Sequence, residues 1–174
     1  EAVRDAILWG LHRDDPAWSF AAEWEYEDAT GETVAAVLRF DRPDGQGGRE
    51  KTYRPVHPEP GGWAVGDPGK PWPLYDLPAV NVPGRVVYFV EGEKCADALA
   101  GLGVAATTTM HGAKSPQHTD LSPLAGRDVV ILPDNDSEGE SYAAKVAGML
   151  EALDPRARVK IARLPGLEPK GDVA

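Results

Sequence analysis

The chain has 174 residues, a length that fits one domain or two small ones and suffices to bury a hydrophobic core. Apolar residues make up 42% of the sequence and charged residues 26%, which is typical of a globular protein. The formal net charge of −10 argues against a freestanding tight DNA binder, whose affinity would come from basic side chains facing phosphates. A single cysteine excludes a disulfide framework and a cysteine zinc ribbon, and it indicates a reducing compartment. We therefore expect a cytoplasmic protein, and no apolar run approaches membrane-spanning length.

Residues 1–80 are expected to form a small β-rich region with a short leading helix. Apolar side chains recur with helical spacing at the start of the chain, and Asp14-Asp15-Pro16 ends that pattern. From Glu23 onwards apolar and polar residues alternate between turn signals, which indicates strands joined as hairpins. The expected segments are a helix over 1–13, a hairpin over 23–40 with its turn at 29–31, a strand at 51–54 after a turn at 44–48, and an irregular connection over 55–73 with a short strand near Trp63.

Five basic residues of this region fall close together in the sequence, beside Tyr53. They are Arg39, Arg42, Arg49, Lys51 and Arg54. A row of this kind on strands could follow the phosphates of a single-stranded nucleic acid, with the aromatic ring stacking on a base. It is more often a solvated sheet face, and the neighbouring acids dilute its positive charge. Both interpretations stay open from the sequence.

Residues 81–174 have the pattern of an α/β domain. Strands are expected at 86–90, 104–109, 129–133 and 159–164, and helices at 93–102 and 138–153. The apolar stripe expected for the first of these helices comprises Cys95, Ala98, Leu99 and Leu102. Strands that alternate with helices predict parallel pairing with right-handed crossovers. The expected fold class is therefore α/β, a parallel sheet flanked by helices, with a smaller N-terminal β-rich lobe.

Carboxylates follow two of the predicted strands directly. Glu91 ends one strand, and Asp134 and Asp136 end another. Ser137 is the expected N-cap of the next helix, with Glu140 as its capping-box partner. Ligands of open α/β sheets bind beyond the carboxyl ends of the strands, so neighbouring strands would bring the three carboxylates together. Such a cluster repels itself unless a cation neutralises it, and Mg²⁺ prefers one or two carboxylates with waters and phosphate oxygens.

Other kinds of site share the spacing of Asp134 and Asp136. An EF-hand loop needs a preceding helix and a glutamate at its twelfth position, where this chain has a preceding strand and Lys145, so an EF-hand is rejected. A haloacid-dehalogenase phosphatase also places Asp-x-Asp after a strand, but Glu138 stands where its threonine is expected. A solvated acidic turn remains an alternative for the motif taken alone.

Three short motifs together resemble the Toprim domain, which bacterial-type primases, type IA and type II topoisomerases and some nucleases share. They are Val90-Glu91-Gly92 after one strand, Asp134-Asn135-Asp136 after another, and Lys170-Gly171-Asp172 near the end of the chain. The longer strings from Phe89 to Leu99 and from Val129 to Gly139 are similar to the Toprim domains of phage and mobile-element primase–helicases. The resemblance predicts an N-terminal region over 1–80 and a Toprim domain over 81–174 that is cut short at its C-terminus.

The resemblance implies roles for the acidic residues that match its motifs. Glu91, Asp134 and Asp136 would be catalytic and would bind Mg²⁺ or Mn²⁺. Asp172 would match the first acid of the third motif and join the metal ligands.

Further candidates lie near the same strand ends. Lys94 and Lys114 are expected to hold a nucleoside triphosphate, although exposed lysines often serve only solubility. Primases of this kind often have an acid four residues after the glutamate, where this chain has Cys95. Whether Asp97 replaces that acid stays open.

The function implied is that of a fragment of a phage- or plasmid-type DNA primase. The reaction would be magnesium-dependent nucleotidyl transfer from nucleoside triphosphates, which makes an RNA primer on a single-stranded DNA template. Helicase and zinc-binding domains would be linked outside this sequence, and no membrane would be involved. Two alternatives stay open: a Toprim nuclease that cleaves phosphodiesters, and a non-catalytic interaction module with the same fold.

Overall fold

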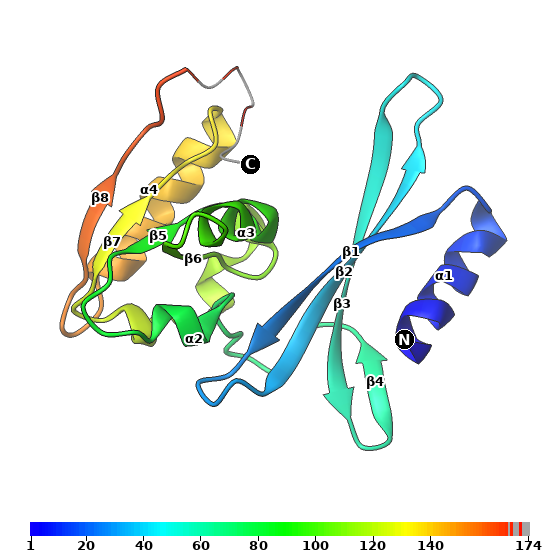
Figure 1. Ribbon diagram of the computed structural model, residues 1–174, viewed down its shortest axis with the longest axis horizontal. Helices are drawn as coiled ribbons and strands as arrows, with labels where there is room; N and C mark the ends of the chain where they lie inside the picture. Colours follow the sequence, from blue (N-terminus) through cyan, green and yellow to red (C-terminus); the bar gives the residue numbers. More distant parts are fainter. Residues whose placement is uncertain (167, 169–170, 172–174) are drawn as a thin grey trace. The chain divides into compact units, whose positions relative to one another are not determined.

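The structure is a computed structural model that describes residues 1–166, 168 and 171 (Figure 1). Within these residues, none of the helices is both long enough and apolar enough to cross a membrane.

The chain divides into two compact units, each with a sheet and a hydrophobic core of its own. The first unit comprises residues 1–26 and 33–69, and the second comprises residues 27–32 and 70–174. Residues 70–80, which the sequence interpretation placed in the N-terminal region, thus group with the second unit.

The first unit is a four-stranded sheet with one helix packed on it, in the strand order β1-β2-β3-β4. Its elements are α1 (Ala2–Asp14), β1 (Ser19–Glu27), β2 (Thr33–Pro43), β3 (Arg49–Glu59) and β4 (Gly62–Val65). Strand β3 pairs antiparallel with β2, as the turn signal at 44–48 predicted, and also with β4. The prediction of an irregular connection from residue 55 is wrong at its start, because β3 continues to Glu59 and its last residues pair with β4. Ile7 of α1 packs with Leu38, Phe40 and Val56. Because alternate residues of a strand share one face, α1 covers a single face of this sheet.

The second unit is a four-stranded parallel sheet in the order β6-β5-β7-β8. Its elements are α2 (Leu77–Val80), β5 (Val87–Phe89), α3 (Glu93–Ala100), β6 (Ala105–Thr107), β7 (Asp128–Ile131), α4 (Ser137–Glu151) and β8 (Arg158–Ile161), with short 3-10 turns at Gly112–Lys114, Pro116–His118 and Ser122–Leu124. The four predicted strands all form and all run parallel, so the predicted α/β class is confirmed.

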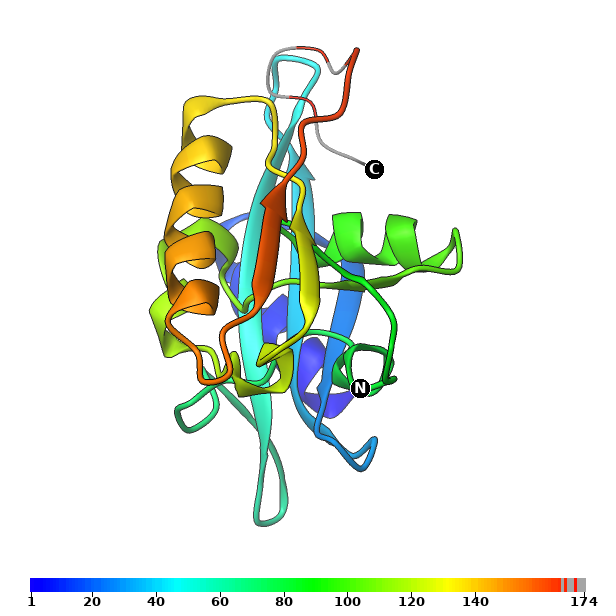
Figure 2. The same cartoon turned by 90° about the vertical axis from the view of Figure 1, so that its left-hand side faces the viewer.

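Helices cover both faces of the parallel sheet, as Figure 2 shows for α3 and α4. Tyr142 and Val146 of α4 pack with Phe89 on one face. Cys95 of α3 packs with Val90 on the other face. Phe89 ends β5 and Val90 follows it in extended chain, bonded through its N–H to the carbonyl of Thr107, so the two side chains point in opposite directions. This two-sided burial explains why the strand reads as a continuous apolar run.

The prediction that Leu102 belongs to the buried stripe of α3 is wrong. The helix ends at Ala100, where the N–H of the C-cap residue Gly101 still bonds to the preceding turn. Gly103 then adopts a left-handed conformation, φ +81°, which reverses the chain without a steric penalty. Leu102 lies beyond the last helical turn and is 78% exposed.

Candidate functional site

Glu91 and Asp134 follow two neighbouring strands at the same edge of the parallel sheet. Strands β5 and β7 pair with Phe89 beside Ile131, and the N–H of Leu132 donates to the carbonyl of Phe89 at 2.9 Å. The segments that follow β5 and β7 leave the sheet just beyond this point. The carboxyl ends of parallel strands are where open α/β sheets bind ligands, so this edge is the candidate site.

The carboxyl group of Glu91 lies in an environment that opposes its negative charge. The side chain is half-buried, and within the described part of the chain its Oε2 atom is buried without a hydrogen-bond partner. Burial, followed by the negative charges of Asp134, Asp136 and Glu138, raises the pKa of Glu91 to about 7. The structure therefore brings Glu91 within electrostatic reach of both aspartates. A nearby cation would stabilise the ionised form of Glu91 at this position.

Asp136 is the N-cap of α4, so the prediction that Ser137 caps this helix is wrong. The Oδ1 atom of Asp136 accepts hydrogen bonds from the second and third backbone N–H groups of the helix, at 3.0 and 2.8 Å. The negative charge also interacts favourably with the helix dipole at this end. Glu140 forms no capping box, because its carboxylate accepts two hydrogen bonds from Arg163, both at 2.6 Å. The cap therefore fixes Asp136, one of the candidate metal-binding aspartates, in place.

Gly139 allows the backbone of Asp134 to lie against the first turn of α4. A Cβ atom at Gly139 would be 2.6 Å from the carbonyl oxygen of Asp134 and 2.8 Å from its nitrogen. These are backbone atoms, so the clash could not be relieved by a change of rotamer. The same carbonyl accepts a hydrogen bond from the N–H of Asp136 at 2.8 Å. The glycine thus sets the position of Asp134 at the strand end.

A second glycine approaches the backbone of Glu91. A Cβ atom at Gly112 would lie 2.7 Å from the carbonyl oxygen of Glu91, and Gly112 itself has φ +50°. Sequence reasoning did not single out this glycine; the only signal was the His111-Gly112 turn pair after a strand. At Gly92, in contrast, a Cβ atom would meet nothing within 4 Å, so the backbone beside Glu91 is open.

The residues at this edge fit a hard divalent cation. Among residues 1–166, 168 and 171, no three His, Cys, Asp or Glu side chains are grouped closely enough to hold a metal ion between them. The donors present are carboxylate oxygens, and the buried Oε2 of Glu91 is left without a hydrogen bond from the described residues. Mg²⁺ is commonly held by one or two carboxylates, with waters and phosphate oxygens completing its shell. Glu91 and Asp134 suit that mode of binding.

The two candidate triphosphate-binding lysines are exposed. Lys94 is the second residue of α3 and lies three positions after Glu91 in the chain. Lys114 ends the short turn that begins at Gly112, the glycine that approaches Glu91. Both lysines therefore belong to segments that start at the candidate site.

The third motif is described only at its glycine. Gly171 accepts a hydrogen bond from the backbone N–H of Asn135 at 3.0 Å, and the Asn135 side-chain amide donates to the carbonyl of Glu168 at 3.1 Å. This part of the C-terminal segment thus lies against the loop between Asp134 and Asp136. The predicted metal ligand Asp172 lies outside the described residues.

Cys95 and Asp97 take no visible part in the acidic cluster. Cys95 is buried among apolar side chains of α3 and the sheet, as a small core residue. Asp97 accepts a hydrogen bond from the hydroxyl of Tyr75 at 2.7 Å, and it is absent from the groups that shift the pKa of Glu91.

Ion pairs occupy most of the basic residues in the first unit. Arg39 donates two hydrogen bonds to Asp41, at 2.7 and 2.6 Å, and Arg49 lies 3.6 Å from the same carboxylate. Asp41 is only 2% exposed, and its hydrogen bonds with Arg39 hold the pKa of its carboxyl below the usual value. Arg42 pairs with two further acids. Within the described structure Lys51 and Arg54 have no such ion pair, and Arg54 instead donates to the Thr52 hydroxyl and the Tyr53 carbonyl. Three of the five basic residues are thus paired with acids, which favours the solvated-face interpretation over a phosphate track.

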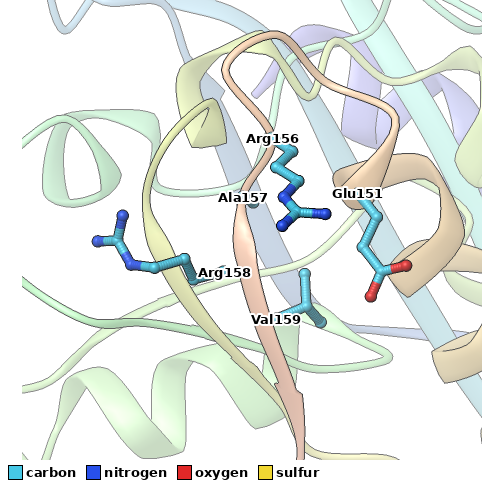
Figure 3. Close-up of a pocket in the computed structure, with 5 residues that line it drawn as sticks. All are labelled: Glu151, Arg156, Ala157, Arg158 and Val159. Carbon is cyan, nitrogen blue, oxygen red and sulfur yellow. The ribbon is translucent and has the colours of Figure 1, made fainter.

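A pocket of about 300 Å³ lies elsewhere, beside the start of β8. In Figure 3 the side chains of Glu151 and Arg156 lie on one side of this strand, and Arg158 extends to the other. Arg158 pairs with Asp128 at the start of β7. The pocket is therefore at the amino ends of the strands, opposite the edge that carries Glu91.

No family model matches the sequence, and no curated protein matches it. The fold is similar to the crystal structure of a DNA primase domain from Pseudomonas aeruginosa, with a TM-score of 0.57 and 23% sequence identity over 85% of this chain and 44% of that one. A structure of the DnaG catalytic core has a TM-score of 0.49 and 20% identity over 85% of this chain and 46% of that one. This chain spans less than half of either. The first likeness shows that the chain shares the fold of part of a DNA primase domain.

Proposed function

We propose that this chain is part of a DNA primase of the phage or mobile-element type, and that its site catalyses nucleotidyl transfer. The observation that carries the proposal is the carboxyl of Glu91, which is half-buried, has an oxygen left without a hydrogen bond, and faces the charges of Asp134 and Asp136. The primase-domain fold and the three Toprim-like motifs support it. The substrates would be nucleoside triphosphates and a single-stranded DNA template.

The chain's own residues would divide the work between metal binding and substrate binding. Glu91 and Asp134 would bind Mg²⁺ or Mn²⁺ directly, with waters and phosphate oxygens. Asp136, whose N-cap hydrogen bonds keep its carboxylate oriented, and Asp172 would complete the set of metal-binding acids. When bound, the ion would position the primer hydroxyl and the triphosphate and neutralise charge that develops during transfer. Lys94 and Lys114 would bind the phosphates from either side of this edge.

The test is primer synthesis by the longest natural chain that contains this sequence. We expect labelled ribonucleotides to be incorporated on single-stranded DNA in the presence of Mg²⁺. Glu91→Gln and Asp134→Asn should each lower the rate by at least about 100-fold, the scale seen when one electrostatic group of an active site is lost. Glu151→Gln, at the opposite edge of the sheet, is the matched control and should leave the rate unchanged.

The same assay separates the alternatives. Shortening of the labelled DNA without incorporation of nucleotides would indicate a nuclease that uses the same carboxylates. Equal rates for all three variants would exclude catalysis at this edge. Helicase and zinc-binding domains linked to this chain are part of the proposal and would be sought in the same full-length protein.

A further inference from the structure

The turn from Thr109 to Gly112, which follows β6, lies against the backbone of Glu91. Its two ends are joined by a hydrogen bond from the N–H of Gly112 to the carbonyl of Thr109 at 3.0 Å, and by a second from the Thr109 hydroxyl to the carbonyl of Gly112 at 3.2 Å. His111 and Gly112 both have positive φ values, 63° and 50°. The left-handed conformation is unfavourable for a residue with a side chain, so this turn needs anchoring.

The anchor is Tyr142, which reaches the turn from α4. Its hydroxyl lies 2.8 Å from the Thr109 hydroxyl, and its ring packs 6.3 Å from that of Phe89 in β5. Tyr142 is 3% exposed and Thr109 is fully buried. A threonine hydroxyl has one proton, so when Thr109 donates to Gly112 it accepts from Tyr142. Burial raises the pKa of Tyr142 to about 12, so this hydroxyl remains a donor.

The hydrogen-bonded path ends at the backbone of Glu91. It runs from Tyr142 through Thr109 to Gly112, which is close enough to the carbonyl of Glu91 that a Cβ atom there would stand 2.7 Å away. A shift of the turn towards β5 would push Glu91 directly. A shift away would leave the half-buried glutamate free to move.

We propose that Thr109 and Tyr142 are positioning residues that hold Glu91 in the geometry needed to bind a divalent cation. The inference rests on the proposed function, because it concerns the same metal site. Neither side chain would touch the ion. Each would act through the turn, and the loss of either hydroxyl would loosen one ligand while the aspartates stay in place.

The test measures Mn²⁺ binding directly, from the electron paramagnetic resonance signal of free Mn²⁺ titrated with the chain. Tyr142→Phe and Thr109→Val each remove one hydroxyl with little change in shape. Each should weaken Mn²⁺ affinity by roughly threefold to tenfold, at or below the lower end of the losses seen when a direct outer-shell partner of a ligand is removed.

Two control variants remove similar groups away from Glu91. Tyr75→Phe deletes a tyrosine hydroxyl that donates to Asp97 at 2.7 Å, and Thr119→Val deletes a buried hydroxyl that has no hydrogen-bond partner in the described structure. Both should bind Mn²⁺ as the wild type does. Affinities of Tyr142→Phe and Thr109→Val equal to those of these controls would overturn the proposal while leaving the metal site intact.

Thr109→Ser separates positioning from general stability. Serine keeps the hydroxyl but leaves a methyl-sized gap in the core, so this variant should melt at a lower temperature and still bind Mn²⁺ with wild-type affinity. Thr109→Val should bind weakly. If affinity instead follows melting temperature across the variants, the effect is structural and the proposal fails. A wild-type chain that binds no Mn²⁺ would overturn both this inference and the metal site on which it rests.

Discussion

At the scale of single residues, Glu91 shows how a carboxylate can be prepared for a cation. Its Oε2 atom is buried and receives no hydrogen bond within the described residues, and the nearby charges are negative. A charged group in this position loses hydration without gaining a donor, which is unfavourable for the folded protein. A hydrated divalent ion would supply the missing positive partner, so the same features that destabilise the metal-free site would favour binding.

Asp134→Asn should abolish the stabilisation of the protein by divalent ions. With Mg²⁺ or Mn²⁺ at about 100 times its dissociation constant, the wild type should gain about 2.7 kcal/mol of folding free energy by mass action. The substitution removes one ligand charge from the strand end, relieves its repulsion of Glu91 and leaves the core unchanged, so the metal-free variant should melt at or slightly above the wild type. Differential scanning calorimetry with and without the ion measures both effects.

Glu138→Gln is the control for that experiment. Glu138 is exposed in the first turn of α4, so the variant should keep most of the metal-dependent shift. Equal losses from the two substitutions, or a wild type that does not respond to either ion, would contradict the proposed site.

The metal-free protein should lose stability as pH rises from about 4.5 to about 7. The pKa of Glu91 is about 7 in the folded state, against an ordinary value of 4.5. The folded state therefore binds this proton more tightly than the unfolded state does, so its stabilisation is complete below the lower value and is lost through the higher one. Melting temperatures of the wild type and of Glu91→Gln in a chelator should converge at low pH and separate across this interval, with the variant higher at pH 8. A constant difference between them would rule out this titration.

At the scale of elements, α4 organises the site through its first turn. Asp136 caps the helix, and Gly139 lets the backbone of Asp134 lie against it. Further along the same helix, Tyr142 reaches the turn beside Glu91. One helix thus places parts of both strand ends, which explains how residues from β5 and β7 can be held in register at a single edge.

Gly139→Ala should displace Asp134 and weaken the response to metal. The added Cβ atom would lie 2.6 Å from a backbone oxygen, so the loop must move, at a cost of about 1–3 kcal/mol. Gly148→Ala in the same helix is the matched control, because a Cβ atom there would meet nothing within 4 Å. That variant should be more stable by up to about 1 kcal/mol, since alanine favours the helix. Thermal unfolding with and without Mn²⁺ compares the two, and a normal metal response in Gly139→Ala would show that Asp134 does not depend on this contact.

At the scale of the whole molecule, acidic residues outnumber basic ones and pair with basic side chains that could otherwise bind the phosphates of a nucleic acid. The chain carries a formal charge of −10, and Arg39, Arg42 and Arg49 in the first unit all pair with acids. A carboxylate held by arginine stabilises the fold but leaves little positive potential for phosphates. Tight binding to DNA would therefore need the metal site or domains outside this sequence.

Arg39→Ala should lower stability alone, whereas Lys51→Ala should lower DNA affinity alone. The first leaves the buried Asp41 without its main donor and should lower the free energy of unfolding by about 2 kcal/mol. Its affinity for a single-stranded oligonucleotide should not change. Lys51→Ala should leave stability unchanged and weaken any binding slightly. Denaturant titration and fluorescence anisotropy measure the two quantities, and a large loss of affinity in Arg39→Ala would restore the phosphate-track interpretation.

The sequence by itself determined the elements and the edge at which the acids lie. Apolar runs and helical periodicity depend on local burial, so the four strands, α3 and α4 were predicted within a few residues. In a parallel sheet the carboxyl ends of all strands lie at the same edge. Glu91 and Asp134 each follow the carboxyl end of a strand, so they could be expected near each other.

Only the tertiary structure decided the hydrogen-bond and packing partners of the individual side chains. Asp136 displaced Ser137 as the N-cap because the helix starts one residue earlier than the pattern suggested. The hydrogen bond between Thr109 and Tyr142 joins residues 33 positions apart, and no local pattern marks either one. Likewise, the bond from Tyr75 to Asp97 and the burial of Asp41 depend on how segments pack. Periodicity records which side chains are buried, whereas their partners depend on contacts between elements that are distant in the chain.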